Sequence, residues 1–287
     1  MMSRTTFTVG ATIALVAAIG VGLFVVRLVR RPPHRFPYDL STLSATDYTA
    51  LTAHPGWEKS TTTVAPRIAL NGLRRAPKSP TAPWILFYPG NDGTQLATAQ
   101  RFIDRVIGDN DWGAAVYAYR GFDSSPGRPN LAAYQRDASA VLDTLVAHEH
   151  LTDQQVHIVA FSMGTWFAAA AGAQAARVGK PVASVSLLGA LDRMEMVIKG
   201  VGAGYRLGDL YETAPFLDAL PAPILVVMGA KDEALGVQQG RNVARRLGSR
   251  AHYVELPNAG HVNLMDHPET ADTVRAMIAS HSATPPR

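Results

Sequence analysis

Short continuous apolar runs alternate with longer stretches of helical character along most of the chain. Short, mostly apolar runs typical of buried strands occur at residues 84–88, 114–119, 156–159, 182–188, 224–228 and 251–256. Stretches typical of helices lie between or after them, at residues 96–107, 131–145, 163–179, 237–247 and 269–280. Repeated strand–helix units with short connections predict the α/β class, with a mostly parallel central sheet covered by helices on both faces. Such a sheet places its functional site at the carboxyl ends of its strands.

The N-terminal part of the chain has a different pattern. Residues 5–26 contain no charged side chain and are long enough to cross a bilayer as a helix. We expect one transmembrane helix in a membrane anchor at residues 1–31, because the apolar run is long for a cleavable signal peptide, which is the alternative, and lacks a small-x-small cleavage site. Proline-marked residues 32–56 predict a juxtamembrane linker. The α/β domain is expected at residues 57–281, with a short cap segment at 190–220.

Charge and composition add to this picture. One arginine precedes the apolar run and four follow it closely, so the positive-inside rule favours a cytoplasmic domain, with a periplasmic domain as the alternative. The net charge of +4 is concentrated near the anchor and suits contact with the anionic head groups of a lipid bilayer. No basic stripe or aromatic platform points to a nucleic-acid partner. The absence of cysteine excludes disulfides and thiolate metal sites.

The apolar run at 156–159 leads into a serine that lies between a strand and a helix. Ser162 has the small residues Ala160 and Gly164 two positions before and after it, which a sharp strand-to-helix turn requires. Such a turn exposes the serine hydroxyl beside the backbone N–H of Met163 and the positive end of the helix. The pattern predicts a nucleophile elbow. Taken alone it is weak, because an arbitrary small-x-Ser-x-Gly match is more often an ordinary turn.

Two further residues follow strands that end at the same edge of the sheet. A nucleophilic serine needs a base and a third group that orients the base. His261, in the loop after residues 251–256, is the leading base, and His267 is its rival. Asp232, after residues 224–228, is the leading orienting acid, with helix capping as its alternative role. Asp192 is the reserve acid.

The chain order Ser162, Asp232, His261 is the order used by the α/β-hydrolase family of serine hydrolases, and the sequence resembles that family over residues 57–279. It is most similar to the branch that carries a single N-terminal membrane anchor and a minimal lid. Residues 119–129, YRGFDSSPGRP, are similar to that branch's loop after the fourth strand. The resemblance implies the α/β-hydrolase fold, preceded by one transmembrane helix, and no cofactor.

The resemblance also implies an oxyanion hole, and the sequence departs from the branch's usual pattern at one position. The loop at residues 88–93 follows the first parallel strand, where the family supplies a backbone N–H to an oxyanion, so Asn91 and Met163 are the expected donors. A plain glycine-rich turn is the alternative. Asp123 stands where the branch usually has glycine, which bears on the shape of its loop.

The leading hypothesis is a membrane-anchored serine hydrolase that cleaves carboxylic ester or thioester bonds, of lipid or acyl-protein type, through an acyl-serine intermediate. One alternative is a serine aminopeptidase of the same fold, with Glu195, Asp209 or Glu212 binding the substrate amine. Another is a catalytically inactive, membrane-tethered binding module. The cap segment is expected to line an open acyl groove, or else to pack on the sheet, through Met194, Met196, Val197, Ile198, Tyr205, Leu207, Leu210 and Phe216.

Two other patterns predict no site. The glycine-rich residues 200–204 neither follow a strand nor open a βα unit, so they do not indicate dinucleotide binding. His148 and His150 are two apart on a helix and cannot share a ligand face, so no metal site is proposed.

Overall fold

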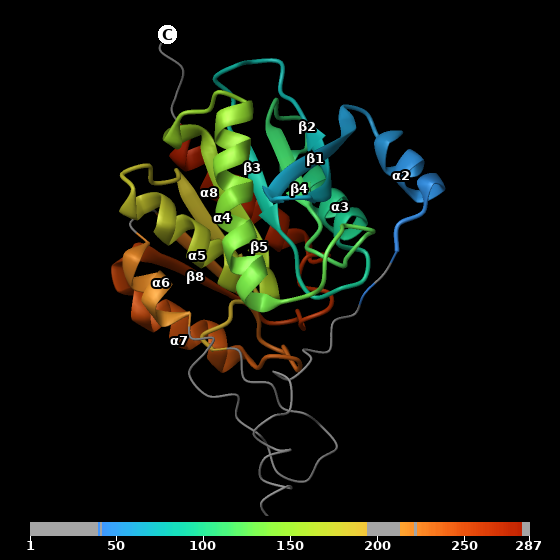
Figure 1. The fold of residues 1–287 in the computed structure, drawn as a ribbon. Helices are drawn as coiled ribbons and strands as arrows, with labels where there is room; N and C mark the ends of the chain where they lie inside the picture. Colours follow the sequence, from blue (N-terminus) through green and yellow to red (C-terminus); the bar gives the residue numbers. More distant parts are fainter. Residues whose placement is uncertain (1–39, 41, 194–212, 221–222, 283–287) are drawn as a thin grey trace, which may run out of the picture. The chain divides into compact units, whose positions relative to one another are not determined.

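A computed structural model describes residues 40, 42–193, 213–220 and 223–282. Among these residues, eight strands form one sheet in the order β1-β2-β4-β3-β5-β6-β7-β8 (Figure 1). The strands are β1 (Trp57–Ala65), β2 (Ile68–Arg75), β3 (Trp84–Tyr88), β4 (Gly113–Tyr117), β5 (Val156–Phe161), β6 (Ser184–Leu188), β7 (Ile224–Gly229) and β8 (Ala251–Leu256).

The sheet is antiparallel only where it begins. β1 pairs with β2 and β2 pairs with β4 in antiparallel register, whereas all pairs from β4 to β8 are parallel. β3 to β7 are buried along their whole length, which explains their unbroken apolar runs, because a parallel sheet is covered on both faces. The predicted mostly parallel sheet is confirmed.

Helices cover both faces of this sheet. The helices are α2 (Ala45–Thr52), α3 (Gln95–Ile107), α4 (Leu131–His148), α5 (Met163–Arg177), α6 (Ala214–Ala219), α7 (Val237–Leu247) and α8 (Pro268–His281). In Figure 1, α4 and α5 pack together in front of the sheet, and α3 and α8 pack together behind it. The parallel strands therefore point their carboxyl ends to one common edge, where the strand-to-helix connections lie.

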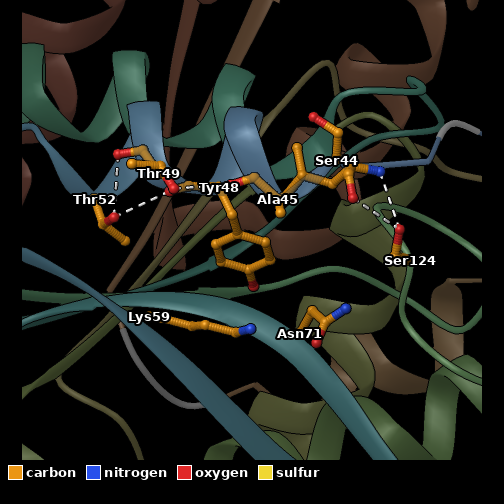
Figure 2. Close-up of a pocket in the computed structure, with 9 residues that line it drawn as sticks. Ser44, Ala45, Tyr48, Thr49, Thr52, Lys59, Asn71 and Ser124 are labelled. Atoms are coloured by element: carbon orange, nitrogen blue, oxygen red, sulfur yellow. Dashed lines mark hydrogen bonds between the residues drawn. The ribbon is translucent and has the colours of Figure 1, made fainter.

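The helix α2 lies inside residues 32–56, where a linker without regular structure was expected. Ser44 and Asp47 form a capping box, in which the Ser44 hydroxyl accepts from the Asp47 N–H and the Asp47 carboxylate accepts from the Ser44 N–H. Figure 2 shows the Tyr48 ring pointing from α2 toward the strand that carries Lys59. Tyr48 is buried, and its hydroxyl donates to the Gly72 carbonyl of β2 at 3.0 Å. This part of the linker range is therefore packed on the sheet. The apolar periodicity missed it because so short a helix buries a single large side chain.

The predicted membrane anchor at residues 1–31 lies outside the described residues, as do residues 194–212 of the cap segment. In the part of the chain that the structure describes, no helix combines the length and the apolar character needed to cross a bilayer. The anchor, its orientation and the domain boundaries stay predictions.

A histidine lies at the centre of the sheet. His157 in β5 is fully buried, its Nδ1 lies 2.8 Å from the Ser184 hydroxyl, and its Nε2 lies 3.3 Å from the Ser282 hydroxyl. Burial, helped by the nearby His281, lowers the pKa of His157 to about 4. The imidazole is therefore neutral in the folded protein at neutral pH.

We expect the free energy of unfolding to fall when the pH is lowered from 7 to 5. In the unfolded chain His157 has a pKa near its ordinary value of about 6.5, so below that pH the unfolded chain binds a proton that the folded chain does not bind. The stability that the neutral His157 contributes is therefore complete above pH 6.5 and is lost as the pH falls toward about 4. His157 should contribute about 2 kcal/mol to the change. Urea denaturation at both pH values measures it. His157→Gln cannot titrate and should show a correspondingly smaller pH dependence; identical pH dependences would contradict the prediction.

Candidate active site

Ser162 occupies the turn between β5 and α5 in a conformation that few residues other than glycine adopt. Its φ is 52° and its ψ is −122°. Three hydrogen bonds hold its backbone there: the Ser162 N–H donates to the Leu188 carbonyl at 2.8 Å, and the N–H and hydroxyl of Thr165 donate to the Ser162 carbonyl at 2.9 and 2.7 Å. The neighbouring strand and the new helix together maintain the turn.

Gly164 shows why this turn requires a small residue two positions after the serine. A Cβ atom at this position would lie 2.1 Å from the Tyr88 carbonyl oxygen and 2.5 Å from that of Pro89. Because these neighbours are backbone atoms at the end of β3, they cannot move aside like a flexible side chain. The first turn of α5 therefore packs directly against the loop that follows β3.

Three predicted residues come together at the carboxyl edge of the sheet. The Ser162 Oγ lies 2.9 Å from His261 Nε2, and His261 Nδ1 lies 2.8 Å from Asp232 Oδ2. The imidazole stacks on the Phe161 ring, with a centroid distance of 5.0 Å. The His261 side chain is 12% exposed and the Asp232 side chain is fully buried. This arrangement connects a hydroxyl, a base and an orienting acid in one line of hydrogen bonds.

The Asp232 carboxylate is held in its charged form. Burial opposes its ionisation, but the hydrogen bond to His261 and the Leu235 N–H, which donates to Oδ1 at 2.8 Å, outweigh burial and keep the pKa of Asp232 below its usual value. A charged carboxylate at Nδ1 favours the tautomer with the proton on that nitrogen. The Nε2 atom is then free to accept the proton of the Ser162 hydroxyl.

The reserve residues have other partners. The Asp192 carboxylate accepts a hydrogen bond from the Asn242 side chain at 3.0 Å. His267 is the N-cap residue of α8. Gly236, and not Asp232, is the N-cap residue of α7, so the alternative capping role of Asp232 is not observed.

The loop after β3 lies directly beside the serine. A Cβ atom on Gly90 would lie 3.3 Å from Ser162 Cβ and 3.0 Å from Phe161 Cδ1. Asn91 is the next residue and is half-buried, and Met163 is the buried first residue of α5. The structure therefore brings the loop that carries Asn91 to Ser162, whereas donation of either N–H to an oxyanion stays a prediction.

The sequence reading missed how Asp123 and Gln95 support this loop. Asp123 is fully buried and has a positive φ of 42°, so it adopts the conformation for which its loop would otherwise use glycine. Its Oδ2 accepts the Leu96 N–H at 2.7 Å, in the first turn of α3. Gln95, the first residue of α3, is also fully buried. A polar residue at a helix start is common, so only the fold reveals these contacts.

Comparison with known proteins agrees with this architecture. A family model described as the alpha/beta hydrolase fold matches residues 83–201. An uncharacterized protein of Mycobacterium tuberculosis, present in strains CDC 1551 / Oshkosh and H37Rv, is 22% identical over 204 residues, which cover 69% of this chain and 70% of the relative.

Solved structures are also similar. A bacterial membrane phospholipase A matches with a TM-score of 0.64 and 19% identity, covering 98% of this chain and 100% of that one. An esterase of Pyrococcus furiosus matches with a TM-score of 0.65 and 14% identity, covering 86% and 97%. Est1E from Butyrivibrio proteoclasticus matches with a TM-score of 0.59 and 16% identity, covering 78% and 98%. At these identities the likeness establishes the fold.

Asp232→Asn should slow the reaction of Ser162 with an electrophilic serine-directed probe by about 10³- to 10⁴-fold, because an amide at Nδ1 can hold the wrong imidazole tautomer. The second-order rate constant for labelling measures this. Asp192→Asn is the matched control, because its carboxylate pairs with Asn242 and not with His261. The assignment of the acid is wrong if the control is the damaging change and Asp232→Asn is nearly silent.

Proposed function

This chain has the alpha/beta hydrolase fold, and we propose that it is a serine hydrolase that cleaves carboxylic ester or thioester bonds through an acyl-serine intermediate. The observation that carries the proposal is the hydrogen-bonded line from Ser162 through His261 to the buried Asp232, at 2.9 and 2.8 Å. Ser162 occupies a strained turn at the sheet edge, as a nucleophile elbow requires. The esterase of Pyrococcus furiosus among the solved structures with this fold supports the choice of bond.

The geometry supports the following steps. His261 Nε2 takes the proton of Ser162 as Oγ attacks the carbonyl carbon, and the charged Asp232 stabilises the imidazolium that forms. The carbonyl oxygen becomes an oxyanion, which accepts hydrogen bonds from the N–H groups of Asn91 and Met163. His261 then gives the proton to the departing alcohol or thiol. Water, deprotonated by His261, attacks the acyl-serine, and the carboxylic acid and free serine are released.

The two alternative functions have less support. An aminopeptidase would need a carboxylate to bind the substrate amine, and the candidates Glu195, Asp209 and Glu212 lie outside the described residues. A binding module without activity has no need for a serine, a histidine and an acid joined in one line. Ester or thioester hydrolysis is the function that the site supports best.

The proposal extends to the membrane. The uncharged residues 5–26 support a membrane anchor, the flanking arginines favour a cytoplasmic catalytic domain over a periplasmic one, and one solved structure with this fold is of a membrane phospholipase A. A tethered enzyme would meet acyl groups presented at a lipid surface. Of the residues expected to line an acyl groove, Phe216 is described: it is half-buried and packs edge-to-face on Trp166 of α5, at 5.9 Å.

A fluorophosphonate probe should label the wild-type protein once, at Ser162. Ser162→Ala should abolish both labelling and ester turnover while leaving the thermal unfolding midpoint near that of the wild type, because the hydroxyl contributes little packing. Ser280→Ala, which changes an exposed serine of α8, is the control and should be labelled normally. Mass spectrometry of the labelled peptide identifies the site. Retained turnover in folded Ser162→Ala would refute the proposed function.

The proposed groove predicts a preference for longer acyl chains. Each methylene removed from water contributes about 0.8 kcal/mol, so burial of only two of the extra methylenes of an octanoyl group favours it over acetyl by about fifteenfold. The ratio of kcat/KM for p-nitrophenyl octanoate and acetate measures this preference. A higher kcat/KM for p-nitrophenyl acetate than for the octanoate would contradict the groove and indicate an esterase for small acyl groups.

A further inference from the structure

A buried glutamine joins the loop after β3 to the loop after β4. Gln95 is fully buried, its Nε2 donates to the Gly90 carbonyl at 2.8 Å, and its Oε1 accepts the Tyr119 N–H at 3.0 Å. The two partners determine the orientation of the amide, because a carbonyl needs the NH₂ group and an N–H needs the oxygen. Both ends of the side chain are therefore committed to backbone groups, one of which belongs to Gly90 beside Ser162.

Tyr119 binds the carbonyl that precedes Gly90 in the loop after β3. Its hydroxyl donates to the Pro89 carbonyl at 3.0 Å. Its buried ring stacks on Tyr134 and packs edge-to-face on Phe167, each with a centroid distance of 5.0 Å. Two consecutive carbonyls, those of Pro89 and Gly90, are thus held by side chains that have no room to move.

The bond to Gly90 determines the direction of the next N–H. The Gly90 carbonyl and the Asn91 N–H belong to one planar trans peptide, in which the two groups point in opposite directions. Because the carbonyl faces Gln95, the Asn91 N–H faces away from it, and Gly90 itself lies against Ser162. The other proposed donor, the N–H of Met163, needs no such support because it lies in the elbow turn.

We infer that Gln95 is a positioning residue that aims the Asn91 N–H at the oxyanion, with Tyr119 steadying the same loop from the preceding carbonyl. The inference rests on the proposed hydrolase function. An N–H group stabilises a transition state only when it is already aimed at the site where charge develops. Without the Gln95 amide, the Gly90–Asn91 peptide can rotate, and the donor then loses its alignment although the serine and histidine keep theirs.

Gln95→Met tests this role, because methionine has a similar length but neither donates nor accepts a strong hydrogen bond. Gln100→Met is the matched control: Gln100 lies on the same helix, is also buried, and its Nε2 donates to a backbone carbonyl, that of Leu51, at 2.8 Å. Gln95→Met removes two side-chain hydrogen bonds and Gln100→Met removes one, so both changes should lower the thermal unfolding midpoint, Gln95→Met by more. Only Gln95→Met should lower kcat, by about 10- to 100-fold with KM within about threefold, since losing a whole oxyanion donor costs about 10²- to 10³-fold.

A transition-state analogue separates positioning from general damage. A trifluoromethyl ketone adds to the serine and places an oxyanion in the site, so its inhibition constant should rise in Gln95→Met by the same factor by which kcat/KM falls. The inhibition constant of the carboxylate product, which has no tetrahedral oxyanion, should stay within about threefold. An unchanged inhibition constant for the ketone would overturn the inference.

Tyr119→Phe provides a second test if Gln95→Met does not fold. It keeps the buried ring and removes only the bond to Pro89, so kcat should fall by about 3- to 10-fold at constant KM. Tyr134→Phe is its control, because that hydroxyl donates to the Arg120 carbonyl instead. Wild-type kinetics in a folded Gln95→Met, or in Tyr119→Phe where Gln95→Met does not fold, would refute the positioning role alone. A wild-type protein without Ser162-dependent turnover would refute the proposed function instead.

Discussion

Ser162 is held at φ 52° and ψ −122°, a conformation that costs a residue with a side chain about 1 to 3 kcal/mol. The surrounding structure maintains it from three sides. Its N–H bonds to the end of β6, its carbonyl accepts from Thr165 in α5, and Gly164 brings the helix against the carbonyls at the end of β3. A larger residue at 164 would separate the helix from that loop. The position of the hydroxyl relative to the loop after β3 depends on this contact.

Strand order then determines which side chains reach the serine. β5, β6, β7 and β8 are neighbours and run parallel, so the residues that follow them lie at one edge of the sheet. The loop after β8 packs back on the end of β7, where the Lys231 N–H donates to the Ala259 carbonyl at 2.9 Å. The loops after β7 and β8 therefore hold His261 and Asp232 together, and His261 alone of the two contacts Ser162. Two elements distant from the elbow in sequence deliver a base that is already oriented and an acid that is already charged.

The buried polar residues on the other side of the serine have a related role. Gln95 and Tyr119 bond to backbone carbonyls of the loop after β3, and Asp123 bonds to the first turn of α3. Each of these three buried side chains has a backbone partner, as the low polarity of its surroundings requires. Buried side chains therefore hold the loop on one side of Ser162, and the hydrogen-bonded pair of His261 and Asp232 lies on the other.

Local patterns were sufficient for most of the elements and for the candidate residues. β3, α7 and β8 have the expected bounds, and Ser162, Asp232 and His261 were identified, because apolar period and turn chemistry are properties of neighbouring residues. The sequence ranked Asp232 above Asp192, although both follow buried strands; the fold of the loop after β8 shows that His261 pairs with Asp232. The sequence missed α2, which buries one large side chain, and the role of Gln95, whose partner Tyr119 follows another strand. Periodicity records which face of an element is buried, whereas hydrogen bonds between loops depend on the order in which strands pair.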